Sequence, residues 1–393
     1  MAADDLAIRR AIVTIKVFGV GGGGNSVLLR MAKSNFVDID LVAVNTDAKQ
    51  LSVLESNGVK VVQIGENLTK GRGTGGDLAA GEAAAKLDEE KIKKAMEGAD
   101  LIFVTAGMGG GAGTGAAPVV ARIAKELGIL TIGVVTLPFT FEGQRKRRLA
   151  NEGIVKMQSN MDALIAVQND NLLKLPENSN MNIVEAFEAA DEILRQAIRC
   201  VAELILTTGV VNVDFADVTT IFRQSESSDA LLGIGRSKKS AVDAVKQAVD
   251  SPLIDKSLDG ARGIILNITG DDKLSLYDVN EATKYIFDNA DPNVNIIFGV
   301  VVDNEMDGMI QATIIATDFA DSMAIKAPNA EIPKTKPMVE KGFDFEPPKA
   351  NPVSNKGFDF EPPTFVNKNK NNGGAFAFPA FKLTDTNKDN KQK

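Results

Sequence analysis

A run of nine residues, Gly107-Met-Gly-Gly-Gly-Ala-Gly-Thr-Gly115, contains six glycines and lies between the apolar segment Leu101–Ala106 and a helix-like segment that begins near Ala116. Glycine has no side chain, so the N–H groups of a strand-to-helix turn can come close to an anion, and the helix dipole adds to the attraction. A purely structural turn rarely needs more than one or two glycines. The run therefore predicts a loop that binds phosphate.

A second glycine run, Gly19-Val-Gly-Gly-Gly-Gly24, follows the strand candidate Ile12–Phe18 and precedes the helix-like segment Val27–Ala32. The glycines at its first, third and sixth positions have the G-x-G-x-x-G spacing of dinucleotide-binding folds. Nicotinamide enzymes, flavin enzymes and some enzymes of nucleoside triphosphates share such a turn, and the P-loop spacing that ends in Gly-Lys-Ser/Thr is absent. Two glycine loops on one sheet predict a phosphate chain longer than one loop would hold.

The composition narrows the chemistry that these loops can support. The 393 residues are 44% hydrophobic, which suffices for a large core in about two or three domains, and the formal charge of −8 does not favour a nucleic-acid-binding surface. The chain contains no histidine, which excludes histidine-based nucleophile triads and HExxH zinc sites. Acid–base or metal chemistry must then rest on carboxylates, which suit magnesium and phosphate better than zinc.

Cysteine content and hydropathy point to a soluble intracellular protein. Cys200 is the single cysteine, so no intramolecular disulfide can form, and its helical apolar surroundings predict a place in the core. No apolar run reaches the roughly 18 residues of a membrane-spanning helix, and Met1–Arg10 lacks the apolar centre of a signal peptide. We therefore expect a cytoplasmic location.

Between Ile12 and about Val167, short apolar runs alternate with helix-like segments. Six runs are rich in valine and isoleucine, namely Ile12–Val17, Leu41–Val44, Val59–Ile64, Leu101–Thr105, Leu130–Thr136 and Ala163–Val167. Continuous apolar strands between helices indicate a parallel sheet that helices cover on both faces. The fold class is therefore α/β, with a Rossmann-like parallel sheet.

A long helix and a second α/β pattern follow this sheet. Apolar residues at steps of three and four, among them Ile183, Phe187, Leu194 and Ile198, predict a helix over Asn182–Leu206 that forms a spine between two domains. Further along, the expected strands are Gly263–Ile268, Asn295–Val302 and Ile310–Ala316, and the expected helices are Ser237–Val249 and Leu276–Asn289.

The chain changes character after Ala320, where proline, asparagine and lysine become frequent. Such a segment buries too little apolar area to offset chain entropy, so we expect a flexible linker. It contains one octapeptide twice, at Lys341–Pro348 and at Lys356–Pro363. The repeat is interpreted as duplication of a neutral linker, with a docking motif as the alternative.

Several polar residues stand where the ligand of an open α/β sheet binds. Asp47 ends the strand candidate Leu41–Val44, where it could hold a ribose hydroxyl or merely form the turn. Glu142 is followed by four cations, so a carboxylate for ribose lies beside charges for phosphate, although a solvated helix face explains most of the cations. Asp191 could accept from the N1–H and amino group of guanine. The Gly71–Gly76 loop is either a mobile surface loop or a phosphate sensor.

Two carboxylates, Asp214 and Asp217, stand three residues apart at the start of the expected helix Phe215–Phe222, so they lie near one face. Capping of this helix by Asp214 is one explanation. The other is that the pair polarises an attacking water or lies near magnesium. Because the two carboxylates follow the long helix, we expect them to be remote from the glycine loops of the same chain, and a catalytic role would require a second subunit.

These motifs together resemble the tubulin/FtsZ family. The run Gly107–Gly115 is similar to the tubulin signature loop, and Asn212-Val-Asp-Phe-Ala-Asp217 is similar to the loop that completes catalysis in the bacterial members. Four further segments occur in the family's order, namely Gly19–Ser26, Ala43–Asp47, Pro138–Gly143 and Ala186–Asp191. The resemblance covers about Ile12 to Asp318.

The resemblance implies a GTPase that assembles head to tail and organises the bacterial division ring. Asn212, Asp214 and Asp217 of one subunit would enter the nucleotide pocket of the next and activate hydrolysis of GTP to GDP, with Mg²⁺ held by the phosphates. The implied nucleotide contacts are Gly22, Gly23, Gly24, Asn25, Ser26, Asp47, Gly111, Ala112, Gly113, Thr114, Glu142, Lys146, Asn169 and Asp191.

The chain departs from the family pattern at two of these positions. Ala112 stands where threonine is usual, and losing one hydroxyl bond to phosphate would cost about 0.5–1.5 kcal/mol. Lys146 stands where arginine is usual, so phosphate charge can be neutralised without bidentate geometry. Near the C-terminus, Phe378–Leu383 is similar to a degenerate copy of the family's partner-binding peptide, which docks membrane tethers, with Phe378 and Phe381 as anchors.

The predicted division of the chain is a flexible N-terminus (1–11), a GTP-binding domain (12–178), a central helix (179–206), an activation domain (207–320), a linker (321–375) and a terminal peptide with a lysine-rich tail (376–393). The expected location is the mid-cell division site in the cytoplasm, with other division proteins and membrane tethers as partners. Two alternatives stay open. One is a dinucleotide-binding oxidoreductase, favoured by the first glycine run and Asp47, and the other is a filament scaffold that does not hydrolyse GTP.

Overall fold

The computed structural model describes residues 13–34, 39–175, 181–206, 213–225, 227–254, 260–303 and 306–319, all within one compact unit, Met1–Ala330. The predicted flexible N-terminus, the linker with its repeated octapeptide and the Phe378–Leu383 peptide lie outside these residues. Asn212 lies outside them as well.

The first half of the described chain forms a parallel sheet, as predicted. Its strands are β1 (Ile15–Val20), β2 (Ile39–Asn45), β3 (Lys60–Gln63), β4 (Leu101–Gly107), β5 (Leu130–Leu137) and β6 (Ala163–Gln168), and they stand in the order β3-β2-β1-β4-β5-β6. Every pairing among them is parallel. The carboxyl ends of these strands therefore meet at one edge of the sheet, which we call the carboxyl edge.

Helices cover both faces of this sheet because its strands are apolar on both sides. Alternate residues of β1 belong to different cores: Val17 packs with residues of one cluster and Phe18 with those of another. The first cluster includes side chains of α2 (Gly21–Lys33), α3 (Ala48–Glu55) and α10 (Ile183–Leu206). The second includes those of α5 (Leu78–Leu87), α6 (Glu89–Met96), α7 (Gly111–Glu126) and α8 (Gln144–Gln158).

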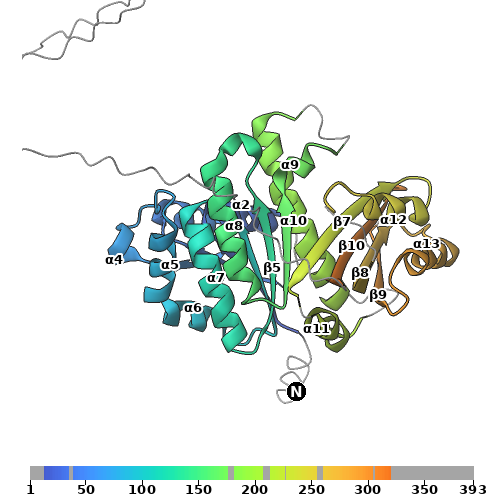
Figure 1. Cartoon of the computed structure of the whole chain (residues 1–393), viewed down its shortest axis with the longest axis horizontal. Coiled ribbons are helices and arrows are strands. Elements are labelled where there is room, and N and C mark those ends of the chain that lie inside the picture. Colours follow the sequence, from blue (N-terminus) through green and yellow to red (C-terminus); the bar gives the residue numbers. More distant parts are fainter. Residues whose placement is uncertain are drawn as a thin grey trace, which may run out of the picture. The chain divides into compact units, whose positions relative to one another are not determined.

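Short elements complete the carboxyl edge. They are α4 (Glu66–Thr69), the 3-10 helix η1 (Thr140–Glu142) and α9 (Asn169–Leu172). Figure 1 shows α9 at the top of the view, directly beyond the end of the sheet.

The second half continues the same sheet. Its elements are α11 (Phe215–Gln224), β7 (Asp229–Ser237), α12 (Ala241–Val249), β8 (Ala261–Gly270), α13 (Leu276–Asn289), β9 (Asn295–Val302) and β10 (Ile310–Phe319). The strand order β7-β10-β8-β9 is joined to β6 by parallel pairing of β7, in which Leu164 lies opposite Asp229 and Ile165 opposite Ala230. Strand β10 is antiparallel to both of its neighbours, so the sheet is mixed.

Strand β7 was not among the strands that the sequence predicts. Its segment, Asp-Ala-Leu-Leu-Gly-Ile-Gly-Arg-Ser, contains two glycines and polar ends, which hide the alternation of apolar residues. The glycines have a packing reason, since a Cβ atom on Gly235 would lie 2.1 Å from the carbonyl oxygen of Ala244 in α12, and one on Gly233 would lie 2.2 Å from that of Ala248. Helix α12 can approach β7 only because both positions lack side chains.

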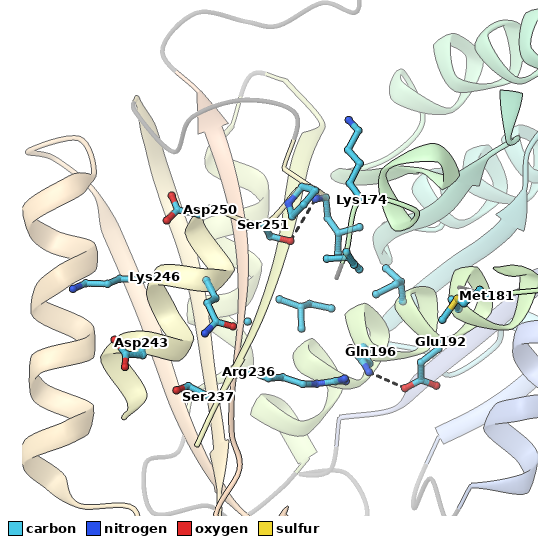
Figure 2. A pocket seen from close by; sticks show the side chains of 18 of the residues that line it. Lys174, Met181, Glu192, Gln196, Arg236, Ser237, Asp243, Lys246, Asp250 and Ser251 are labelled. Carbon is cyan, nitrogen blue, oxygen red and sulfur yellow. Dashed lines mark hydrogen bonds between the residues drawn. The ribbon is translucent and has the colours of Figure 1, made fainter. Parts of the chain in front are cut away.

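One side of α10 borders a cleft of about 1450 Å³ that separates it from β7 and α12. Figure 2 shows Glu192 and Gln196 of α10 on one side of this cleft, with Arg236 of β7 and Lys246 of α12 on the other. The guanidinium of Arg236 points toward the side chains of α10, whereas Lys246 Nζ points away from the cleft and lies 5.4 Å from the ring centroid of Tyr285.

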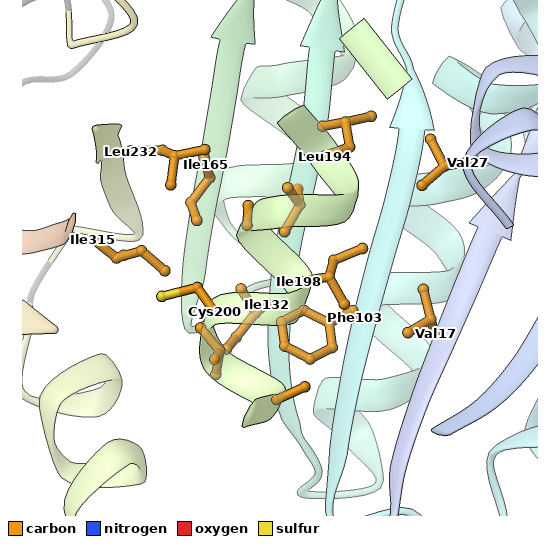
Figure 3. Close-up of a cluster of buried hydrophobic side chains, with 14 of the residues drawn as sticks. Val17, Val27, Phe103, Ile132, Ile165, Leu194, Ile198, Cys200, Leu232 and Ile315 are labelled. Carbon is orange, nitrogen blue, oxygen red and sulfur yellow. The ribbon is translucent and has the colours of Figure 1, made fainter. Parts of the chain in front are cut away.

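The opposite side of α10 packs into the core, as the predicted spine requires. Figure 3 shows Leu194 and Ile198 against residues of the parallel sheet such as Phe103, and Cys200 near Ile315 of β10. Cys200 is buried among core residues, which confirms its predicted place in the core, and this burial raises the pKa of its thiol. The first turn of α10 differs from the prediction, because Ile183 is 61% exposed and Phe187 is 41% exposed. This turn extends past the core toward the carboxyl edge.

Within the ranges that the structure describes, no helix is long and apolar enough to cross a membrane.

Candidate functional site

The two glycine runs meet at the carboxyl edge and pack backbone against backbone. A Cβ atom on Gly21 would lie 2.4 Å from the backbone nitrogen of Gly113, and one on Gly23 would lie 2.9 Å from the Cα atom of Gly107. Gly21 also has a φ of +69°, which side chains rarely adopt. These glycines are therefore required by the contact between the two loops, a role that the sequence analysis did not foresee.

Other glycines of the same runs face open space. Nothing lies within 4 Å of a Cβ atom built on Gly110, and a Cβ atom on Gly22 would meet only the side-chain amide of Gln50, at 3.6 Å. Both residues are exposed. Their main-chain atoms are exposed to solvent, as an anion-binding surface requires.

Each glycine run begins in a strand and ends in the first residues of a helix. The expected helix starts near Val27 and Ala116 are wrong, because α2 begins at Gly21 and α7 at Gly111. Neither helix has a side-chain cap, whereas α3, α5, α11, α12 and α13 each begin with an aspartate or serine that accepts from the first turn. Uncapped first turns at a common edge leave N–H groups directed at the same space.

Side chains around the first turn of α2 brace it from within the protein. With its amide oriented so that both ends are satisfied, Asn25 donates to the carbonyl oxygen of Gly19 and accepts from Nδ2 of Asn45, each at 2.8 Å. The carbonyl oxygen of Gly22 accepts from Ser26 Oγ and Gln50 Nε2, each at 3.2 Å. The side chain of Asn25 is buried and fully engaged. The backbone N–H groups left for a ligand are those in the first turn of α2, at Gly21, Gly22 and Gly23, because they have no acceptor within the helix.

Asp47 acts as the N-cap of α3. Its Oδ1 accepts from the backbone nitrogens of Lys49 at 3.0 Å and of Gln50 at 3.2 Å. Asp47 therefore forms the turn that starts α3, which is one of the two roles that the sequence allows. Its contact with a ribose hydroxyl stays a prediction.

Glu142 and Lys146 pair with one another. Glu142 Oε2 lies 2.9 Å from Lys146 Nζ, and its Oε1 accepts from the backbone nitrogen of Phe139 at 3.0 Å. The segment also contacts the second glycine run, since a Cβ atom on Gly109 would lie 2.9 Å from the carbonyl oxygen of Lys146. Thr114 Oγ1 accepts from the nitrogen of Gly109 at 2.7 Å, which fixes the turn before α7.

Three buried oxygens at this edge have no hydrogen-bond partner in the described part of the chain. They are Oγ1 of Thr46, Oγ1 of Thr105 and Oδ1 of Asn169, which follow or end β2, β4 and β6. Asn169 is 4% exposed. A buried amide oxygen without a donor is costly, so the edge has an acceptor that a ligand could satisfy.

Asp191 lies on α10, with a side chain that is 17% exposed. Its Oδ2 accepts from Nε of Arg30 at 3.1 Å. Burial raises the pKa of Asp191 to about 6, although the Arg30 guanidinium opposes that rise. A carboxylate held charged with so little water contact is typical of a binding site.

Phe187 of α10 clusters with two other aromatic rings. Phe139 stacks on Phe141 with ring centroids 5.0 Å apart, and Phe187 meets Phe139 edge to face at 5.4 Å. Phe187 precedes Asp191 by four residues, so both lie on one face of α10. The apolar spacing along α10 predicts Phe187 as a core residue rather than a site residue, although the same spacing places it one turn before Asp191.

Arg30 and Gln50 were missed for a different reason. Both act through partners that are distant in sequence, Asp191 and Gly22, and no local pattern reports such contacts.

Asp214 and Asp217 lie at the opposite edge, as expected. Both are exposed, and Asp214 Oδ1 caps α11 by accepting from the nitrogen of Ala216 at 3.1 Å. At the other end of α11, Arg223 donates to the carbonyl oxygen of Gly128, which precedes β5, and so contacts the amino edge of the parallel sheet. Figure 1 shows α11 at the bottom of the view and α9 at the top.

The structure therefore separates the predicted residues into two groups. The predicted nucleotide contacts gather at the carboxyl edge, and the two described carboxylates of the predicted catalytic set stand at the amino edge. The large cleft beside α10 is lined by none of these residues.

A twisted, mostly parallel sheet with glycine-started helices at its carboxyl edge defines a nucleotide-binding α/β protein. Residues 14–177 match the GTPase domain of the Tubulin/FtsZ family, and residues 228–320 match the FtsZ family C-terminal domain.

Solved structures agree with these matches. The chain is 37% identical to FtsZ of M. jannaschii solved as an empty dimer, with a TM-score of 0.74, over 81% of this chain and 92% of that one. A point mutant of the same protein gives 36% identity and a TM-score of 0.75, over 81% and 96%. CetZ2 from Haloferax volcanii, a GTPγS-bound protofilament, gives 25% identity and a TM-score of 0.65, over 80% and 95%. The chain belongs to the tubulin/FtsZ family of GTPases.

Proposed function

We propose that this protein binds GTP at the carboxyl edge, assembles head to tail into filaments and hydrolyses GTP where two subunits meet. The observation that carries the proposal is the placement of the two residue groups at opposite edges of one sheet. Stacking of identical subunits brings the amino edge of one onto the carboxyl edge of the next, which would join the groups. The empty dimer of FtsZ and the GTPγS-bound protofilament of CetZ2 are assemblies of relatives and support this arrangement.

In this proposal the carboxyl edge recognises both ends of the nucleotide. The uncapped first turns of α2 and α7 offer N–H groups to the phosphates, and Lys146 supplies positive charge. The Asp191 carboxylate accepts from N1–H and the amino group of guanine, and Asn169 provides a further acceptor. The exposed ring of Phe187 offers a stacking surface. Mg²⁺ enters with the phosphates, because this ion retains water and phosphate ligands readily.

The Gly71–Gly76 loop belongs to this edge as a phosphate sensor. A Cβ atom on Gly111 would lie 2.1 Å from Oγ1 of Thr74 and 2.7 Å from the backbone nitrogen of Asp77, so the loop packs on the first turn of α7. If phosphate binding shifts that turn, the loop that packs on it will move as well.

Asp214 and Asp217 orient and polarise the attacking water from the neighbouring subunit. Neither is buried, and neither pairs with a cation in an ion pair of its own chain within the described residues. Exposed carboxylates without an ion pair in the described part of their own chain are available to a neighbouring molecule, and Asp214 keeps one oxygen besides the one that caps α11.

Mixing two inactive variants tests the composite site. Asp217→Asn leaves the pocket intact and removes a carboxylate of α11, and Asp191→Ala damages the pocket but leaves α11 intact. We expect each variant alone to lose most phosphate release, and the mixture to exceed the sum of the two, because one interface in a mixed filament has both intact halves. Phosphate release and sedimentation with GTP are measured in parallel.

The controls separate catalysis from assembly. Asp243→Asn removes a carboxylate from the first turn of α12, a position equivalent to Asp217 in α11, and should leave hydrolysis unchanged. The wild-type rate per molecule should rise with protein concentration above a threshold. A rate per molecule that stays constant on dilution, together with no gain on mixing, contradicts the proposal.

The biological role that this activity best fits is organisation of the bacterial division ring at mid-cell. Matches to the FtsZ C-terminal domain and to FtsZ structures support it over a dinucleotide-binding oxidoreductase. Partner proteins and membrane tethers would bind the Phe378–Leu383 peptide. Depletion in cells, scored for filamentation rather than altered shape, distinguishes division from another cytoskeletal role.

A filament scaffold without turnover is the second candidate, and Ala112 favours it. This position in the first turn of α7 carries a methyl group where a hydroxyl is usual in the family, so one phosphate contact is missing. Sedimentation with GTP in the absence of phosphate release would support the scaffold. An Ala112→Thr variant with faster release would show that the hydroxyl limits the rate.

A further inference from the structure

Helix α2 spans from one part of the proposed pocket to another. Its first turn contains Gly22, at the proposed phosphate site, and its last turn contains Arg30. Eight residues separate the two, which is about 12 Å along a helix. Arg30 Nε lies 3.1 Å from Oδ2 of Asp191, and its Nη2 lies 3.1 Å from Oε1 of Glu188. One guanidinium thus bridges two carboxylates that are three residues apart on α10.

We infer that Arg30 is a positioning residue for guanine recognition, which holds Asp191 charged and oriented, and that Glu188 tunes it by sharing the same guanidinium. The inference rests on the proposed function, because it concerns the carboxylate that would read the base.

The electrostatic surroundings of Asp191 support this role. Its side chain is mostly buried, and burial favours the protonated form. Arg30, from α2, favours the ionised form of Asp191 by a hydrogen bond and by its positive charge. Glu188, from α10, favours the protonated form because its negative charge repels that of Asp191. Two cations nearby are engaged elsewhere, since Lys174 Nζ donates to Asn171 Oδ1 at 2.7 Å and Arg195 pairs with Glu192. Arg30 is therefore the cation that maintains the charge.

The charge on Asp191 decides what it can recognise. An ionised carboxylate accepts hydrogen bonds from both N1–H and the 2-amino group of guanine. A protonated carboxyl presents a donor of its own to those donors and loses this pairing. Affinity for guanine nucleotides should therefore fall as the pH drops through the midpoint of Asp191, by about 10-fold for each pH unit below it.

The test compares the pH dependence of GDP affinity in the full-length wild type, Arg30→Gln and Glu188→Gln. Fluorescent GDP is titrated from about pH 5.5 to about pH 8.5, a range that brackets the midpoint of about 6. The diphosphate titrates identically in all three proteins, so differences between the profiles belong to the protein. We expect the midpoint to move up in Arg30→Gln and down in Glu188→Gln.

Near neutral pH, Arg30→Gln should bind GDP several-fold more weakly than the wild type and recover at the alkaline end. Arg30→Lys, which keeps the charge, should restore most of the shift. Glu188 is half exposed, so its variant should fold even if Arg30→Gln does not.

Two results would overturn the inference, and they are distinguishable. If both variants keep the wild-type midpoint, or if Arg30→Gln loses affinity by one factor at every pH, Arg30 does not control the charge of Asp191. If the wild type binds GDP no better than ADP throughout, the proposed function fails, and the role of Arg30 fails with it.

Discussion

The carboxyl edge of the parallel sheet and the first turn of α11 treat their polar groups in opposite ways. At the carboxyl edge, α2 and α7 start without side-chain caps, Asn169 buries an oxygen without a partner in the described residues, and Asp191 is charged with little water around it. At α11, Asp214 caps its own helix and Asp217 stands in solvent. The carboxyl edge therefore leaves the first N–H groups of α2 and α7 and the amide oxygen of Asn169 without partners. The first turn of α11, in contrast, is capped by a residue of its own segment.

This difference separates stability from function. Groups that await a ligand destabilise the free protein, so changes at the carboxyl edge should alter folding and binding together. Exposed carboxylates contribute little to the fold, so changes at α11 that keep its N-cap should alter hydrolysis with little effect on stability.

Gly21→Ala should give the largest loss of stability. Its new methyl group would meet the backbone of Gly113, and its φ of +69° disfavours any side chain, so we expect a loss of about 2–4 kcal/mol. Gly110→Ala, with open space around it, should change stability by less than about 0.5 kcal/mol. Denaturant unfolding measures both, and equal effects would show that the two loops do not rest on one another.

Asp191→Asn should stabilise the ligand-free protein while abolishing guanine selectivity. The pKa of Asp191 is raised to about 6 from an ordinary 3.8, so the folded state takes up a proton more readily than the unfolded state. The protonated side chain of Asp191 stabilises the folded protein fully below the pKa of this group in the unfolded chain. This stabilisation is lost as the pH rises through about 6. At neutral pH the ionised form costs about 1–3 kcal/mol, which asparagine removes. Thermal unfolding at neutral and acidic pH checks this, since the gain should shrink below pH 4.

Asp214→Ala and Asp214→Asn form a matched pair at the other edge. Alanine removes the N-cap of α11 and should cost about 1 kcal/mol, whereas asparagine caps nearly as well as aspartate. Both remove the carboxylate, so both should lose hydrolysis to a similar extent. Activity retained by asparagine alone would mean that Asp214 serves the fold rather than the reaction.

Asp217→Asn should have the smallest effect on stability. The side chain is exposed, and its one structural contribution is a favourable charge in the first turn of α11, worth about 0.3–1 kcal/mol at low ionic strength. We expect a shift in unfolding free energy at the lower end of that range, together with a loss of hydrolysis. A large destabilisation would show that Asp217 has a contact within its own subunit that matters.

The sequence predicts the fold well where signals are local. Apolar runs locate β9 and α13 to the residue, and the steps of three and four along α10 identify the spine. Strand β7 is missed because Gly233 and Gly235, which admit α12, resemble loop residues. A local sequence pattern does not show that a glycine is required for the close packing of a neighbouring helix.

The site is predicted less completely than the fold. The glycine runs and Asn169 stand at the carboxyl edge as expected, because parallel strands bring their ends together, whereas Asp191 comes from the third turn of α10. The partners of these residues were beyond reach, since Arg30 meets Asp191 across 161 residues of sequence. The exposure of Phe187 was also hidden, because helical spacing does not tell where a helix leaves the core.

The backbone contact between Gly21 and Gly113 limits how the affinity of this protein for its ligand can evolve. A surface made of main chain has no side chain to exchange, and a side chain added at Gly21 would meet the backbone of Gly113. Adjustment is left to the rim, at positions such as Ser26, Gln50 and Ala112. We therefore expect the glycines of the main-chain surface to change more slowly in evolution than the residues around it.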